Sequence, residues 1–322
     1  MRETLVIAGA GCSRGALGPN SPTAAEFGAA LLRVEPAWTS KYTGLAQCVE
    51  ELSEMLPGTS PGAWGLDKVW GAVDNRAKLY RATGKPDFQV SKDLHAVICE
   101  VFGRRLDSDI AKVVAGAQSN LRSIISGLQQ PVWYVSFNYD LLIDELAQSL
   151  DGAVIKPHGS VDWSRSVPDY GRPPVHCSRA MEPRDVMEPH MGGPGVHPAI
   201  VGPVPFKSEL AIEVQLAGNC LGFHQELTYQ WRQMVDHLAL CSELVVIGYG
   251  FPPEDVHAVH LFREAALRRR RRKAPRLKLT VHERDEQRFK ETIEHIQEVF
   301  WDDEVAWPSS NAEPINDGAP AP

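Results

Sequence analysis

The stretch TLVIAGAGCSRG, residues 4–15, decides the fold, because a short apolar run leads directly into Gly9-Ala10-Gly11. An apolar run followed by glycines predicts a buried strand, a tight turn and a helix. Such a turn lets backbone N–H groups approach a phosphate, and the N-terminus of the helix adds its positive dipole end. The full dinucleotide fingerprint is not met, since Arg14 stands at the third glycine position and Gly15 comes one residue late. A tight turn without a ligand therefore stays open as the alternative.

Further short runs along the chain are also nearly continuous in Val, Ile and Leu. They lie at 132–137, 153–156, 244–248 and 277–282. Continuous apolar runs indicate strands covered on both faces, as in a parallel sheet between helices. Helical periodicity occurs at 42–56, 66–82, 92–106, 109–128, 219–241 and 286–300. We predict an α/β fold with a Rossmann-like, doubly wound, mostly parallel sheet and an inserted helical module at about 38–128.

Composition narrows the class of protein. The chain has 322 residues, 43% of them hydrophobic and 23% charged, which is typical of a soluble globular protein. A net charge of -8 argues against a general nucleic-acid coat, and no apolar run approaches the roughly 20 residues of a membrane span. The N-terminus does not read as a signal peptide. We therefore expect a cytoplasmic protein with no membrane partner.

Metal ligands are not predicted. The six cysteines are scattered without a C-x-x-C pair, so they predict reduced thiols and no zinc ribbon. His176, His190 and His197 are spaced too irregularly among prolines to indicate a metal site.

Two segments read as irregular. The stretch 164–208 holds nine of the 24 prolines and predicts a loop, a candidate lid over a site. The tail 308–322 consists mostly of Pro, Ala, Ser, Asn and Gly and predicts disorder, which leaves 1–307 as one domain.

Polar side chains follow the second predicted strand, where ligands bind in open parallel sheets. Ser136, Asn138 and Asp140 stand there. An Asn side chain offers a donor and an acceptor that suit sugar hydroxyls or a held water. Asp140 is better explained as the cap of the following helix, which leaves a ligand role more plausible for Asn138.

The next strand ends carry similar signals. His158 and Gly159 follow the third strand, and a neutral imidazole can serve as a general base. A lone histidine is more often structural, but this one stands at a strand end, as Asn138 does. Gly248 and Gly250 end the strand at 244–248, and Asp255 is expected to cap the helix after it. Four such ends on one edge of a sheet predict a nucleotide site.

The basic run 268–273 has two interpretations. Six positive charges in a row can bind nucleic acid or an acidic partner. They can also complement the dipole at a solvated helix end. Given the net charge of -8, we favour the second interpretation.

Five blocks in order resemble the sirtuin superfamily, and within it the sirtuin-like NAD hydrolases of bacterial antiphage defence. The blocks are GAGCS at 9–13, PTAAEF at 22–27, SFNYD at 136–140, KPHGS at 156–160 and the glycine block at 244–255. The resemblance covers residues 4 to about 282. It implies a Rossmann-like NAD-binding domain over 1–307 with an inserted small module, and NAD as the substrate.

The resemblance also implies roles for the strand-end residues. Asn138 would hold the nicotinamide ribose or the attacking water, His158 would act as base or orient the ribose hydroxyls, and Asp140 would steady the site. The remaining residues would contact the nucleotide, with the glycine turn cradling the pyrophosphate. They are Gly9, Ala10, Gly11, Ser13, Ser136, Gly159, Gly248 and Gly250.

Departures from the family's deacylases select the branch. Those enzymes carry a four-cysteine zinc ribbon, which this chain cannot supply, and their Gln-Asn-Ile-Asp is Phe137-Asn138-Tyr139-Asp140 here. Their D-F-R segment and acyl-lysine wall are absent. We expect an NAD glycohydrolase that releases nicotinamide and ADP-ribose in antiviral defence, controlled by homo-oligomerisation or a separately encoded sensor. An ADP-ribosyltransferase, a zinc-free deacylase and an NAD- or ADP-ribose-binding regulatory module remain alternatives, and nucleic-acid binding by this chain ranks below them.

Overall fold

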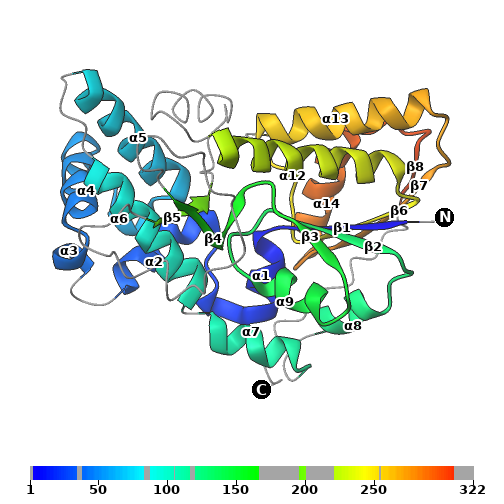
Figure 1. Cartoon of the computed structure of the whole chain (residues 1–322), viewed down its shortest axis with the longest axis horizontal. Helices are drawn as coiled ribbons and strands as arrows, with labels where there is room; N and C mark the ends of the chain where they lie inside the picture. Colours follow the sequence, from blue (N-terminus) through cyan, green and yellow to red (C-terminus); the bar gives the residue numbers. More distant parts are fainter. Residues whose placement is uncertain are drawn as a thin grey trace.

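A parallel sheet forms the centre of the protein (Figure 1). The computed structural model describes residues 3–34, 38–82, 88–104, 106–116, 120–166, 196–200, 221–253 and 255–307. The six strands run in the order β3-β2-β1-β6-β7-β8, and every neighbouring pair is parallel. They are β1 (Thr4–Ala8), β2 (Val132–Ser136), β3 (Ala153–Ile155), β6 (Glu243–Ile247), β7 (Leu277–His282) and β8 (Val305–Ala306). The order reverses at β1, so the predicted doubly wound α/β fold is confirmed.

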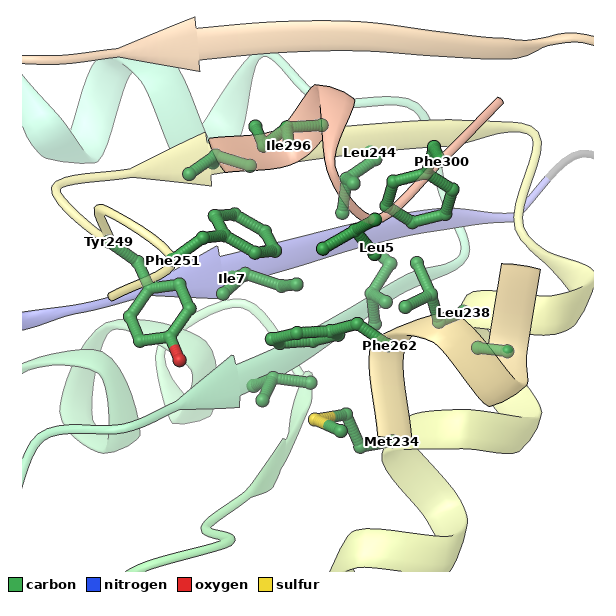
Figure 2. Close-up of a cluster of buried hydrophobic side chains, with 14 of the residues drawn as sticks. Leu5, Ile7, Met234, Leu238, Leu244, Tyr249, Phe251, Phe262, Ile296 and Phe300 are labelled. Atoms are coloured by element: carbon green, nitrogen blue, oxygen red, sulfur yellow. The ribbon is translucent and has the colours of Figure 1, made fainter. Parts of the chain in front are cut away.

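Both faces of the sheet are covered, which explains why its strands are apolar without alternation. From β1, Leu5 and Ile7 point into a core with helices α12 (Leu221–Leu240), α13 (Val256–Arg271) and α14 (Glu286–Gln297) (Figure 2). Val6 and Ala8 point into the opposite core. That core contains residues of helices α1 (Ala10–Leu17), α7 (Asp107–Val114), α8 (Leu121–Ser126) and α9 (Leu142–Gln148).

A helical module with its own apolar core stands beyond the carboxyl ends of the strands (Figure 1). Its helices are α2 (Phe27–Arg33), α3 (Trp38–Lys41), α4 (Thr43–Met55), α5 (Leu66–Ala82) and α6 (Phe88–Cys99). Short 3-10 turns precede or join them at η1 (Gly18–Asn20), η2 (Ala24–Glu26) and η3 (Pro61–Ala63), and a π-helical turn, η4 (Glu100–Arg104), extends α6. The sequence therefore predicted the module correctly in kind.

Its predicted bounds, 38–128, need correction at both ends. Along the sequence, the residues of the module core run from Phe27 to Phe102. Tyr139 and Val161, much later in the chain, also belong to it. The predicted helix at 109–128 is two helices, α7 and α8, and both pack on the sheet instead. Helix α7 ends at Val114, and Gly116, two residues later, has a φ of +81°, the left-handed conformation common just after a helix.

The sequence predicted an irregular loop over the proline-rich stretch 164–208, but part of this stretch forms strands. Strand β4 (Gly159–Ser166) runs into its start, strand β5 (Val196–Ile200) lies within it, and the two strands pair antiparallel. Residues 167–195 and 201–220, which include most of the proposed lid, lie outside the described residues, as does the tail 308–322. Among the helices that the structure does describe, none is long and apolar enough to cross a membrane.

The basic run lies at the end of α13, and its first three residues contact other parts of the protein. Arg269 is buried, and its guanidinium donates to main-chain carbonyls of Leu238, Cys241 and Pro275. Arg268 pairs with two carboxylates, and Arg270 lies over the Trp301 ring at 4.8 Å. These contacts favour the interpretation as a helix end.

Candidate functional site

The glycine turn after β1 packs directly against the end of β6. Gly9 N–H donates to Ile247 O, and Gly11 N–H donates to Gly248 O. A Cβ atom on Gly9 would lie 2.6 Å from Gly248 O, and one on Gly248 would lie 2.1 Å from Cys12 N. The φ of Gly248 is +58°, so glycine is required there for conformation as well as for space. These glycines bring two backbones into contact at the carboxyl edge of the sheet.

This contact changes how the turn could meet a phosphate. The N–H groups of Gly11 and Cys12 already donate to Gly248 O and Gly9 O. The predicted cradle of Gly9, Ala10, Gly11 and Ser13 lies at the start of α1, as expected. Two of its backbone N–H groups, however, are already bonded inside the protein. Its contact with a nucleotide stays a prediction.

Asn138 ties the loop after β2 to this turn. Its side-chain amide donates to Gly9 O and to Ser13 Oγ, each at 2.8 Å. Its main-chain N–H donates to Ser136 Oγ at 3.3 Å. Both donors of the amide are thereby occupied, and the Oδ1 atom is the part of this side chain that suits a ligand hydroxyl or a water.

Asp140 continues the same network. The Ser13 hydroxyl that accepts from Asn138 bonds in turn to the Asp140 carboxylate. Leu142 N–H donates to Asp140 Oδ1 at 3.0 Å at the start of α9, as the predicted capping role requires. Burial raises the pKa of Asp140 above its ordinary value, while the Lys156 charge and the two hydrogen bonds oppose the rise. Asn138, Ser13 and Asp140 thus form one buried chain of hydrogen bonds.

A buried lysine holds this network in place, and sequence reasoning assigned it no role. Lys156 is 1% exposed, and its Nζ donates to Asp140 O at 2.7 Å and to Asp144 Oδ2 at 2.9 Å. Its main-chain N–H donates to Gln230 Oε1. The ion pair therefore joins the end of β3, the loop after β2 and helix α9. Lys156 lies two residues before His158, so it also anchors the segment that carries the histidine.

His158 lies among aromatic rings at the same edge of the sheet. Phe137 follows β2 and Tyr249 follows β6, and their rings stack at 4.3 Å, so they link the two strands that flank β1. The His158 ring packs edge-on against Phe137 at 5.1 Å and tilted against Trp231 at 5.7 Å. Figure 2 places Tyr249 by the tips of the strands.

Asp255 approaches this histidine. Its Oδ2 atom lies 3.4 Å from His158 Nε2, and both side chains are nearly buried. Its Oδ1 atom accepts from Ala258 N–H, which confirms the predicted cap of α13. The contact with His158 was not predicted, because the two residues are 97 positions apart and the sequence between them gives no signal for it.

Glu283 is a second carboxylate that sequence reasoning missed. It follows β7, is buried, and accepts from Thr292 Oγ1 at 3.1 Å. Burial raises its pKa above the ordinary value. Its charge also reaches the Cys12 thiol, whose pKa burial raises strongly, so Glu283 lies near the glycine turn. An acidic residue directly after a strand was the available signal, in the sequence VHERD at 281–285.

The predicted residues divide into those that the structure brings together and those that lie apart. Gly9, Gly11, Ser13, Ser136, Asn138, Asp140 and Gly248 share contacts around the start of α1. Gly159 adopts a φ of +76° beside His158, where glycine is favoured. Gly250 is exposed, and its main-chain oxygen accepts from the His295 ring instead of joining these contacts. No group of metal-ligating side chains is found within the described ranges.

Comparisons with known proteins add little. No protein-family model and no curated protein matches the chain. Among solved structures, one on sirtuin substrate affinity is 14% identical over 86% of this chain and 80% of its own, with a TM-score of 0.32. A Sir2 complex with a deacetylated p53 peptide and 3′-O-acetyl ADP-ribose is 13% identical over 96% and 89%, with a TM-score of 0.35. At these TM-scores and identities the likeness carries no argument about function.

Proposed function

We propose that this protein is an NAD glycohydrolase that cleaves the bond between nicotinamide and ribose. The observation that carries the proposal is the meeting of the Asn138–Ser13–Asp140 network with the glycine turn at one sheet edge, where His158 follows the neighbouring strand β3. Open parallel sheets bind ligands at this edge, next to the strand where the order reverses. The resemblance of the sequence blocks to sirtuin-like NAD hydrolases supports the choice of NAD.

The proposed reaction uses water as its only co-reactant. The bond between the ribose C1′ and the nicotinamide nitrogen breaks, and its electron pair leaves with nicotinamide. Water attacks C1′, and the proton it loses passes to His158 acting as general base. Asn138 would orient the water or a ribose hydroxyl through Oδ1, because its amide N–H groups are occupied. The products are nicotinamide, ADP-ribose and a proton.

The protein groups around His158 suit such a step. Aromatic side chains surround the imidazole and limit the access of bulk water. A dry, preorganised site strengthens electrostatic interactions and keeps the reacting groups in position. A hydrolase of this kind would deplete the NAD of its own cell. The proposal therefore includes control of the activity by self-association or by a separately encoded sensor, and the resemblance of the sequence blocks adds a role in antiviral defence.

The test is NAD turnover by the full chain and three variants. We expect the parent to release nicotinamide and ADP-ribose in equal amounts, measured by chromatography. His158→Ala should lose at least about 100-fold, the lower range of a general base, and Asn138→Ala should also lose activity. His260→Ala is the matched control, since His260 is an exposed histidine on α13. Melting temperatures show whether each variant is folded.

The outcomes separate the alternative functions. Equal turnover by the parent and His158→Ala would refute the site. Protein carrying ADP-ribose instead of free ADP-ribose would indicate a transferase. Intact NAD that stays tightly bound to the parent would indicate a regulatory binding module.

A further inference from the structure

Asp255 has two carboxylate oxygens with two separate tasks. Oδ1 accepts from Ala258 N–H at 3.3 Å and begins helix α13. Oδ2 lies 3.4 Å from His158 Nε2, with 13% of the Asp255 side chain and 10% of the His158 side chain exposed. The turn before the helix is closed by Asp255 N–H, which donates to Pro252 O at 3.0 Å. The carboxylate is therefore held in place by its own helix while its second oxygen faces the imidazole.

The apolar surroundings of His158 strengthen the interaction between its imidazole and the Asp255 carboxylate. Three aromatic side chains pack on His158: Phe137, Tyr139 and Trp231. Interactions between charges are stronger where water is excluded. The Asp255 charge also raises the pKa of the Tyr139 and Tyr249 hydroxyls, after the larger effect of burial, so it acts on this whole group of rings.

We propose that Asp255 is a positioning residue, which fixes the orientation of His158 and holds the ring proton on Nε2. This assignment puts the basic lone pair on Nδ1, so Nδ1 is the atom that would take the proton from water. The role in catalysis rests on the proposed hydrolase function, whereas the contact with His158 does not. Titratable groups on the neighbouring elements include Tyr139, whose ring packs on His158, and Tyr249, which the Asp255 charge reaches. The His257 ring packs on Trp231, which itself packs on His158.

The test compares Asp255→Asn with Asp285→Asn in the full chain. Asp285 is the matched control, because it caps α14 through the same kind of bond, to Arg288 N–H at 2.9 Å. Asn is a good helix cap, so both variants keep that function and lose one charge. Should Asp255→Asn fail to fold, Asp255→Ser keeps a capping hydroxyl and replaces it. The His158 ring is followed by NMR with labelled histidine, and its resonance is identified by its loss in His158→Gln.

We expect the His158 ring in Asp255→Asn to titrate at a lower pH than in the parent, because a negative charge that favours the imidazolium is gone. Asp285→Asn should leave that midpoint unchanged. The turnover number for NAD should fall about tenfold or more in Asp255→Asn with KM unchanged, as part of the roughly 10²–10⁴-fold contribution of a general base.

Each other outcome has a distinct meaning. An unchanged His158 midpoint in Asp255→Asn would overturn the proposal, whatever the turnover. A lower midpoint with the turnover of the parent would overturn the positioning role. A lower midpoint in Asp255→Asn, together with a parent chain that does not hydrolyse NAD, would support the contact with His158 and count against NAD hydrolysis by the isolated chain.

Discussion

Replacing Gly248 by Ala tests the contact on which the candidate site is built. The new Cβ atom would lie 2.1 Å from Cys12 N and 2.4 Å from Gly11 C, both of them backbone atoms. Side-chain rotation cannot relieve such a clash, so the end of β6 must move away from the glycine turn. The residue would also keep a φ of +58°, which disfavours any side chain.

The expected loss of stability has two parts. The left-handed conformation costs about 1 kcal/mol, and overpacking in a close-packed region typically adds about 1–3 kcal/mol. We therefore expect Gly248→Ala to lower the free energy of unfolding by about 2–4 kcal/mol, a large part of the roughly 5–15 kcal/mol of a typical domain.

The control isolates the steric part. Gly116 also has a positive φ, +81°, but a Cβ atom there would meet only Arg122 Cδ at an ordinary 3.8 Å. Gly116→Ala should therefore show the conformational cost alone, about 1 kcal/mol. Urea unfolding followed by tryptophan fluorescence and circular dichroism measures both variants. If they differ by less than about 0.5 kcal/mol, within ordinary non-additivity, the close contact of the two backbones would be refuted.

Two further predictions concern the buried charges. Lys156→Met should lower the free energy of unfolding by about 3–5 kcal/mol, because it leaves the Asp144 carboxylate buried without its partner. Lys278→Met, at an exposed ion pair, is the control and should lower the free energy of unfolding by less than about 1 kcal/mol. Equal losses in urea unfolding would contradict the buried ion pair. The raised pKa of Glu283 means that the folded state keeps a proton that the unfolded state has lost, so this contribution to stability is present below the ordinary pKa of 4.5 and disappears as the pH rises through the folded-state value. Melting temperatures should therefore rise in Glu283→Gln relative to the parent as the pH increases above about 4.5, and a constant difference would show that the pKa is not raised.

Local sequence patterns were enough to predict the strands and the residues that follow them. The runs at 4–8 and 244–248 are continuous in apolar residues because helices cover both faces of the sheet. The glycines at 9 and 11 follow β1 within a few residues, and the polar residues from 136 to 140 lie at the end of β2 or just after it. These features depend on backbone geometry over short distances, which the sequence records directly.

Local sequence patterns could not predict the bounds of the helical module. Amphipathic helices show the same periodicity whether they pack on the module or on the sheet, so α7 and α8 were grouped with the wrong core. The strands β4 and β5 were missed because their register is irregular and prolines dominate the stretch between them.

The sequence by itself determined that this chain forms a parallel α/β sheet with a glycine turn, and that Asn138, Asp140 and His158 follow its strands. Only the tertiary structure decided which of these groups meet. Asn138 bonds Gly9 across 129 positions, and Asp255 faces His158, because the order β2-β1-β6 brings distant strand ends to one edge. Propensity and periodicity act over a few residues, whereas these contacts depend on how the sheet and its helices pack. The contact of Asp255 with His158 depends on this packing, whereas its helix cap was predicted from the local sequence.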